Sequence, residues 1–388
     1  MHSPPISCPV VRVPEVVPCN PAELDSLIAW LESDTSTDEV RAFARGTALP
    51  DGRLDLCKQS VGPHGCALLT QALRHNSHIK SVLLGTDAIG DDGAREVAEL
   101  IGANPHLEVI YLGCNGISAR GALELARVLE TNASAKGLWL KRNPIGDEGV
   151  AGLAAMLKRN AHLQILDIVN CGFSSAALAP LFTVLRDSNR TLQRLYVGGN
   201  GLGAVSAPGF GEILRLNPAL EGLFLNVNDL GDEGAQIIAE SLASNRTVRE
   251  LGLGSNGIGA AGLTAICAAL SGESGLESLD LGRAASQVTL GASGNDFSGG
   301  GEVLAAMLRG NSSLCRLNLR GTQLKQDDFA VIFDAASRHS RLSELLLDSP
   351  LREDVKAQLK RNANFYSWSG DVGVALIKSV YRTAKKPK

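Results

Sequence analysis

Residues 135–162 read AKGLWLKRNPIGDEGVAGLAAMLKRNAH, and this stretch decides the fold because it recurs along the chain. Copies of the segment, this one included, begin at Ile79, Leu107, Ala135, Leu163, Leu192, Leu220, Val248, Leu276, Leu314 and Leu342. A degenerate copy begins near Asp51. The period is 28 residues, with one copy of 29 and one of 38. A fixed period of this length predicts a solenoid, in which each repeat packs on its neighbours.

Each copy has two halves with different periodicities. The first half, LxxLxLxxN, alternates apolar and polar residues and predicts a short strand with one buried face. The second half, such as GDEGVAGLAAMLKRN at residues 146–160, spaces its apolar residues three and four apart. That spacing predicts a helix with one buried stripe. The sequence therefore predicts an α/β solenoid with a parallel inner β-sheet and outer helices.

Two columns of asparagine run through the repeats. The first follows the strand and holds Asn115, Asn143, Asn200, Asn228, Asn256 and Asn295. Stacked asparagines there can bind the backbone of the turns, so we predict a structural ladder. The second column holds Asn76, Asn104, Asn132, Asn160, Asn189, Asn217, Asn245 and Asn311. It falls at the helix ends, where asparagine tolerates a left-handed backbone.

The pattern resembles the ribonuclease-inhibitor type of leucine-rich repeat, which is also used in the sensor arms of NLR immune receptors and in Ran GTPase activators. The resemblance covers residues 51 to about 349. It implies a horseshoe of about ten repeats of 28–29 residues, with strands inside and helices outside. Neighbouring strands are about 4.8 Å apart and packed helices about 10 Å apart, and this difference predicts the curvature.

Four segments follow from this repeat. Residues 1–20 are proline-rich and predict a flexible leader, and residues 21–50 predict an N-terminal cap helix. Residues 51–349 hold the repeats, ten copies and a partial last one. Residues 350–388 predict a C-terminal cap helix and a basic tail. In that tail Val372, Leu376, Ile377 and Val380 fit one helical face, which favours a packed segment over a contact with membrane or nucleic acid.

Composition narrows the function classes. The net charge of -4 is small, so it favours neither a nucleic-acid nor a membrane-surface partner. The sequence has no apolar run long enough to span a membrane. Its eight cysteines are scattered, as expected for reduced thiols in a cytoplasmic protein. We expect a monomer that binds another protein.

The repeat also accounts for several motifs that suggest chemistry. GIGAAG at residues 257–262 has the spacing of a dinucleotide-binding loop, yet other copies read AIGDDG and PIGDEG at the same place. The motif is therefore a turn, and no cofactor is expected. His75 and His78 lack a third metal ligand, so no metal site is expected. Acidic pairs such as Asp147 and Glu148 begin helices, and no catalytic residue is expected.

The fifth residue of LxxLxLxxN lies between two buried leucines and faces out of the concave sheet. This inner column and the positions beside it contain aromatic and charged residues: Tyr111, Trp139, Asp167, Tyr196, Phe224, Lys141, Arg194 and Asn226. Exposed aromatics beside charges are typical of protein-binding hot spots, so we predict that these residues form the partner site. Alternatively, the rings pack on one another as a lateral ladder that stabilises the sheet.

One repeat carries about ten extra residues, Arg283–Ala292, between its strand and Asn295. This insertion either joins a partner site at the rim or is a tolerated surface loop.

The predicted function is a non-enzymatic protein-binding scaffold, either a regulator or a bacterial effector delivered into a host cell. The alternative is a GTPase-activating protein that resembles the Ran-directed family. That family has an acidic tail, whereas this tail is basic, and Arg95 lies on a predicted helix rather than in a rim loop. A ribonuclease inhibitor fits less well, since that family is acidic and rich in cysteine.

Overall fold

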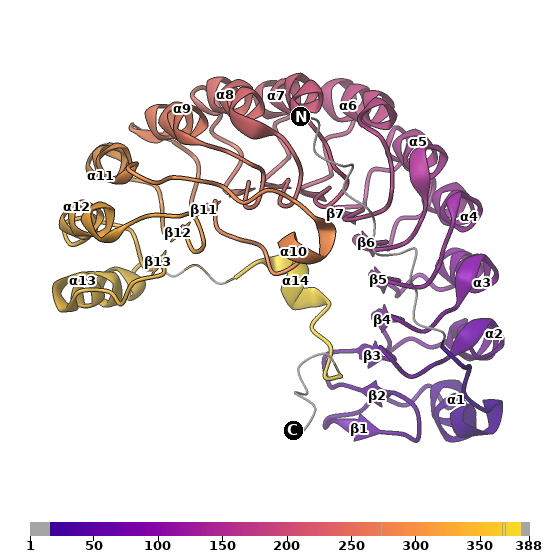
Figure 1. The fold of residues 1–388 in the computed structure, drawn as a ribbon. Helices are drawn as coiled ribbons and strands as arrows, with labels where there is room; N and C mark the ends of the chain where they lie inside the picture. The colour runs from indigo at the N-terminus through magenta and orange to yellow at the C-terminus, as the bar shows by residue number, and fades with distance from the viewer. Residues whose placement is uncertain (1–15, 273, 367, 369, 382–388) are drawn as a thin grey trace. The chain divides into compact units, whose positions relative to one another are not determined.

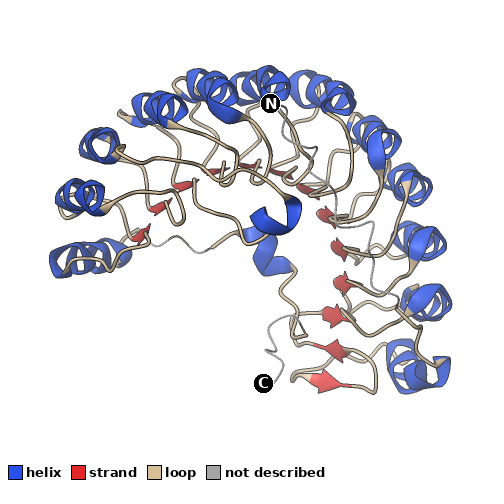
Figure 2. Cartoon of the chain, viewed as in Figure 1, coloured by secondary structure: helices blue, strands red, loops and turns tan. Residues whose placement is uncertain are grey.

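The computed structural model describes residues 16–272, 274–366, 368 and 370–381. Strands and helices alternate along the chain, which divides into two compact units (Figure 1). Of the described residues, 16–173 and 370–381 form the N-terminal unit, and those between 174 and 368 form the C-terminal unit. Within each unit the longer helices cover one face of the strands (Figure 2). This arrangement confirms the predicted solenoid, and the uncovered face is called the inner face below.

In the N-terminal unit the first turn of helix is η2 (Pro21–Leu24). Its strands are β1 (Arg41–Ala42), β2 (Thr47–Ala48), β3 (Arg53–Asp55), β4 (Ser81–Leu83), β5 (Val109–Tyr111), β6 (Gly137–Trp139) and β7 (Ile165–Asp167). Its helices are α1 (Asp25–Glu32), α2 (Gly62–Leu73), α3 (Gly90–Ala103), α4 (Ala119–Leu129), α5 (Gly146–Leu157) and α14 (Val372–Leu376).

In the C-terminal unit two helices begin with the 3-10 turns η3 (Ser175–Ala177) and η4 (Ala204–Ser206). Its strands are β8 (Arg194–Tyr196), β9 (Gly222–Phe224), β10 (Glu250–Gly252), β11 (Ser278–Asp280), β12 (Arg316–Asn318) and β13 (Glu344–Leu346). Its helices are α6 (Leu178–Asp187), α7 (Ala207–Leu216), α8 (Gly231–Leu242), α9 (Ala260–Leu270), α10 (Gln287–Leu290), α11 (Gly301–Gly310), α12 (Gln326–Ala336) and α13 (Glu353–Ala363).

The two periodicities of the repeat build one core layer between sheet and helices. In the repeat that contains β6 and α5, Leu138 and Leu140 point from the strand side into the core and are fully buried. Val150 and Leu153 meet them from the helix and are also buried. Adjacent strands are parallel and in register, since Leu138 pairs with Ile110 of β5 and with Leu166 of β7. Every strand therefore presents equivalent positions to the same face.

The first asparagine column follows the strands and links successive turns. Asn143 Oδ1 accepts hydrogen bonds from the backbone N–H groups of Asn115 and Ile117, at 2.8 and 3.1 Å. Its Nδ2 donates to the carbonyls of Leu112 and Leu140. In the C-terminal unit, side-chain to backbone bonds of the same kind connect Asn200 to Asn228 and Asn256 to Asn295. These bonds satisfy polar backbone groups that are buried where the chain leaves the sheet.

The second asparagine column also holds backbone groups, but not in the expected conformation. Asn104, Asn217 and Asn311 have extended backbones with φ of -105°, -90° and -85°. The left-handed conformation predicted for them is therefore wrong. Their side chains instead accept from the N–H groups that follow, as Asn311 Oδ1 does from Ser313 and Leu314 at 3.0 and 2.8 Å.

The first repeat is covered by more than the predicted helix. Leu24, Leu27 and Leu31 of η2 and α1 are fully buried, and α1 packs against α2. Strands β1 and β2 form an antiparallel hairpin that pairs with β3, an element that the sequence did not indicate. Residues 16–20 are held against the repeat, since Cys19 N donates to Ser60 O. The rest of the predicted leader, residues 1–15, lies outside the described part of the chain.

The insertion Arg283–Ala292 contains the short helix α10 in the C-terminal unit. Ser255, fully buried three residues after β10, accepts a hydrogen bond from Ala284 N and donates one to Gln287 Oε1, both at 2.9 Å. Leu290 is also buried. The insertion is therefore fixed to the neighbouring repeat rather than loosely attached.

Candidate functional site

Strands β5, β6 and β7 place the predicted inner-face residues of the N-terminal unit next to one another. Tyr111 pairs with Trp139, and Trp139 pairs with Asp167, in the parallel register. The side chain of Lys141, two residues after Trp139 in the sequence, lies on the same face of the sheet. Its Nζ lies 5.6 Å from the centre of the Tyr111 ring and 3.9 Å from Asp167 Oδ2. The predicted residues of this unit thus form one cluster.

The large side chains of this cluster are not exposed, which contradicts the prediction for them. Tyr111 and Trp139 are 3% and 1% exposed, and Asp167 is 3% exposed. The rings lie flat along the sheet because a glycine on the same face leaves room for each of them. A β-carbon at Gly137 would collide with the Trp139 ring, and one at Gly113 would collide with the Tyr111 phenol. Each of these two rings therefore packs over a glycine two residues away in its own repeat.

Asp167 is a buried carboxyl among these rings. Burial raises its pKa to about 6, because the charged form loses water. The nearby Lys141 ammonium and the hydrogen bond from Val169 N, at 3.0 Å, oppose this rise. The negative charge of Asp371, near the C-terminal end of the chain, raises the pKa of Asp167 further. The carboxyl is therefore partly protonated near pH 6.

The inner face of the C-terminal unit repeats the lateral packing with other partners. The Tyr196 and Phe224 rings stack with centroids 4.2 Å apart and planes 3° apart. Tyr196 is 7% exposed, so its predicted exposure is also wrong, whereas Phe224 and Asn226 are half-buried. Asn226 lies against Gly252 and Gly254 of the next strand.

Arg194 reaches across β9 to a residue that the sequence analysis did not select. Its Nη2 lies 2.6 Å from Glu250 Oε1, and both side chains are about one-tenth exposed. The pair passes over Gly222, which has no side chain to block it. The signal was present in the sequence, since Arg194, Gly222 and Glu250 occupy one column at successive repeats.

Strands β11 to β13 add further polar residues that were not among the predicted site residues. Asn318 Nδ2 donates to Asp280 Oδ1 at 2.7 Å, and Arg316 lies 3.4 Å from Glu344. The Arg316 guanidinium also lies over the Trp368 ring, 4.5 Å from its centre. Asp280 and Asn318 stand in the inner column, so the column position alone could have found them. Trp368 could not be found in this way, because it follows the last repeat.

Residues 370–381, called the C-terminal segment below, lie on the inner face of the N-terminal unit. Figure 1 shows this segment, in yellow, on the side of β3–β7 that faces away from α2–α5. Ile377 is 2% exposed, while Val372 and Val380 are 48% and 40% exposed. The single apolar helical face predicted for these residues is therefore wrong, because α14 ends at Leu376 and the chain continues without helix. The predicted basic end, from residue 382, lies outside the described residues.

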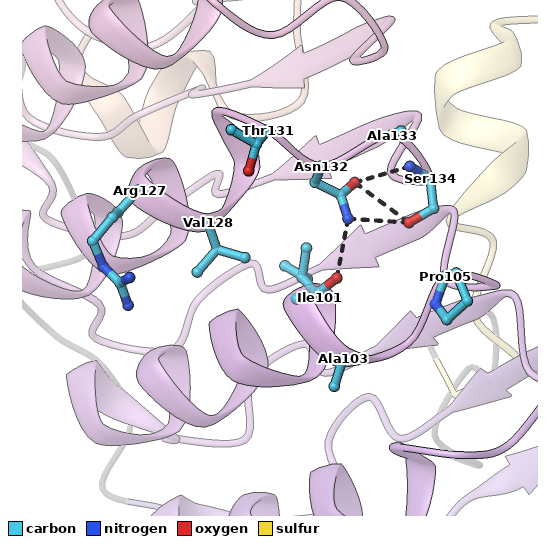
Figure 3. A pocket seen from close by; sticks show the side chains of 10 residues that line it. Ile101, Ala103, Pro105, Arg127, Val128, Thr131, Asn132, Ala133 and Ser134 are labelled. Carbon is cyan, nitrogen blue, oxygen red and sulfur yellow. Dashed lines mark hydrogen bonds between the residues drawn. The ribbon is translucent and has the colours of Figure 1, made fainter.

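A hollow at the ends of α3 and α4 has a volume of about 620 Å³ (Figure 3). Its polar groups already serve the repeat. Asn132 Nδ2 donates to Ile101 O at 3.0 Å, and Asn132 Oδ1 accepts from Ser134 N at 3.1 Å. The hollow therefore offers little polar chemistry for a ligand.

Other features give no second site. Within residues 16–381, gaps aside, no group of three or more histidine, cysteine or acidic residues could hold a metal ion. The helices of the described residues also include none that is long and apolar enough to cross a membrane. Arg95, which bears on the GTPase-activating alternative, lies on α3, where its Nη2 contacts Glu96 Oε1 at 3.2 Å.

Comparison with known proteins agrees with this architecture. A family model described as "Leucine Rich repeat" matches residues 103–126 and 244–267. No curated protein matches the chain.

Among solved structures, one of Rad7 and Elc1 in complex from yeast is 15% identical, with a TM-score of 0.53, and the match covers 87% of this chain and 88% of that one. The actin-binding site 2 of leiomodin-1 is 17% identical over 42% of this chain and 86% of that chain, with a TM-score of 0.34. The C-terminal domain of tropomodulin from Caenorhabditis elegans is 15% identical over 35% and 81%, with a TM-score of 0.30. Together with the observed strands and helices, the family-model match and the Rad7–Elc1 likeness show that the chain carries leucine-rich repeats and folds as a leucine-rich-repeat solenoid.

Proposed function

We propose that this protein is a non-enzymatic scaffold whose inner face binds a protein partner. The observation that carries the proposal is that the helices of eight or more residues cover only one face of each parallel sheet (Figure 2). Parallel sheets are ordinarily covered on both faces. An inner face that carries half-buried aromatic, amide and charged side chains is therefore suited to covering by another polypeptide. The likeness to a chain of the Rad7–Elc1 complex, which was solved bound to another protein, is compatible with this function.

The residues proposed to contact the partner differ in what they can contribute. Phe224, Asn226 and Lys141 are half-buried and keep surface that a partner can cover. Tyr111, Trp139, Asp167, Tyr196 and Arg194 are buried and set the shape of the face beneath them. We propose that, within each unit, the half-buried residues make the contacts and the buried residues of the same unit hold them in place, as expected for hot spots on a rigid support.

We further propose that the scaffold works in the cytoplasm, as a regulator or as a bacterial effector inside a host cell. The free thiols of Cys66, Cys267 and Cys315, all buried, support a reducing compartment. Burial raises the pKa of Cys267 to about 12, which keeps its thiol protonated and unreactive.

The proposal is tested by chemical cross-linking of the full chain to proteins of the cell in which it occurs, followed by affinity measurement with each identified partner. Lys141→Glu and Phe224→Ala are expected to weaken binding by at least tenfold. Lys158→Glu and Val205→Ala are matched controls, since both residues are exposed outside the inner face. Equal affinities for all four variants, with circular dichroism unchanged, would rule out the inner face as the binding surface.

A further inference from the structure

The inner face of the N-terminal unit already holds a polypeptide, the C-terminal segment. Ser379 Oγ lies 3.1 Å from Asp55 Oδ1, and Val380 N donates to Asp55 Oδ2 at 2.7 Å. The Thr47 and Tyr381 hydroxyls are 2.6 Å apart. Three of these residues come from the end of the chain and two from its beginning, more than 300 positions away in sequence.

Asp55 is the anchor of this contact, and it is an unusual residue for its position. It ends β3 in the inner column, where Leu83, Tyr111 and Trp139 end the next three strands. It is fully buried, although a buried carboxylate requires hydrogen-bond donors. Its own turn supplies one donor, Cys57 N at 3.1 Å. The C-terminal segment supplies the Ser379 hydroxyl and the Val380 amide.

The segment lies along the inner column of the N-terminal unit, from β7 to β3 (Figure 1). At its beginning, the charge of Asp371 raises the pKa of Asp167, which ends β7. Near its end, Ser379 binds Asp55, which ends β3.

The contact is polar at one end and apolar in its middle. Ile377 and Gly373 are buried, and Lys378 O accepts a hydrogen bond from Arg53 Nη1. The opposite side of the segment is exposed, with Val372 and Val374 at 48% and 55%. Helix α14 has only five residues, too few to be stable in isolation. The segment is thus ordered by the face rather than by its own helix, as expected of a ligand that can leave.

We infer that the C-terminal segment is an intramolecular ligand of the inner face, and that the partner of this face binds there as an extended segment in its place. In such a segment, a serine hydroxyl and the next backbone amide would donate hydrogen bonds to Asp55. An aliphatic side chain two residues before that serine would occupy the position of Ile377, and a tyrosine hydroxyl would hydrogen-bond to Thr47. This inference rests on the proposed function, since it specifies what the inner face binds.

The test uses the full chain and a fluorescein-labelled synthetic peptide of residues 370–381 as the probe. Ile377→Asp combined with Tyr381→Ala releases the segment and leaves the face intact. We expect this release variant to bind the peptide at least tenfold more tightly than the wild-type chain, in which the site is filled. Val374→Asp, on the exposed side of the same segment, is the matched control and is expected to behave as wild type.

Two further measurements make the inference falsifiable. Adding Asp55→Asn to the release variant is expected to weaken peptide binding about tenfold, because the amide replaces an acceptor oxygen with a donor. Hydrogen exchange at Val380 in the wild-type chain is expected to accelerate when excess unlabelled peptide is added.

Equal peptide affinity in wild type and release variant would overturn the inference, as would a release variant that unfolds without binding peptide. A concentration-dependent dimer of the wild-type chain that the release variant lacks would also overturn it, because the segment would then belong to a second copy. None of these readouts needs a partner. Failure of the inference is therefore distinguishable from failure of the proposed function, which is judged by partner affinity alone.

Discussion

His339 occupies the helix-end position that asparagine fills in most repeats, and this substitution makes one part of the fold sensitive to acid. Its Nδ1 accepts hydrogen bonds from the N–H groups of Arg341 and Leu342, at 3.1 and 2.9 Å. Asn311 Oδ1 makes the equivalent pair of bonds one repeat earlier. Only a neutral imidazole has a lone pair on Nδ1, so protonation removes the acceptor. Burial, reinforced by the Arg341 charge, lowers the pKa of His339 to about 4.

The sign of the effect follows from the two protonation equilibria. The imidazole takes up a proton near pH 6.5 in the unfolded chain but only near pH 4 in the folded chain. The unfolded state therefore binds more protons between these values, and stability falls as the pH falls. Between pH 7.5 and pH 4.5 the loss from this residue is about 2.5 kcal/mol, at about 1.4 kcal/mol for each pKa unit.

His339→Asn is expected to keep the acceptor at all pH values and so to abolish this part of the acid sensitivity. The assay is hydrogen exchange of α12 and β13 at the two pH values, corrected for the intrinsic exchange rate, because repeats can open locally. His106→Asn replaces an exposed histidine and is the matched control. If His339→Asn loses as much protection at pH 4.5 as the wild type does, the assigned role of the imidazole is wrong.

Two further predictions concern buried polar groups. Glu250→Leu leaves the Arg194 guanidinium buried without its carboxylate, and we expect it to lower the free energy of urea unfolding by about 3 kcal/mol. Arg249→Leu breaks the exposed ion pair with Glu277, and we expect it to lower the same free energy by less than about 1 kcal/mol. Comparable losses in the two variants would contradict the buried ion pair. Asn143→Ala removes four ladder hydrogen bonds and is expected to cost about 4 kcal/mol by the same assay, at about 1 kcal/mol for each bond. A loss no larger than that of the exposed Asn364→Ala would show that water replaces the ladder.

The architecture could be predicted from the sequence because it depends on local spacing. Apolar residues at every second position specify a strand, and apolar residues spaced three and four apart specify a helix. The 28-residue period places this strand and helix in every repeat. Equivalent positions such as Leu138 and Leu166 then come into register. The hairpin β1–β2 escaped prediction because it lies before the first full copy, where the period gives no information.

The exposure of inner-face residues could not be predicted, since it depends on what lies over each side chain. The column position correctly places Trp139 on the inner face, but it does not say that the ring tilts over Gly137. A weak signal existed, because glycine stands two residues from the aromatic in Tyr111–Gly113, Gly137–Trp139 and Gly222–Phe224. The C-terminal segment gave no such signal, since it contacts residues more than 300 positions away.

A residue that differs from its equivalents in the other repeats, such as Asp55, indicates what the inner face can bind. Leu83 shows that the inner column accepts an apolar residue, which would need no partner in order to be buried. The Asp55 carboxylate, in the same column, loses its hydrogen bonds to water when the face is covered. Those bonds are replaced when the covering chain supplies hydrogen-bond donors, as Ser379 and Val380 do. An apolar segment laid on this face would leave the carboxylate unsatisfied and would bind poorly. We expect a segment with a hydroxyl and a free amide at this place to bind better, because it supplies the donors that Asp55 needs. If the inference holds, Asp55 selects the chemistry of what the face can bind.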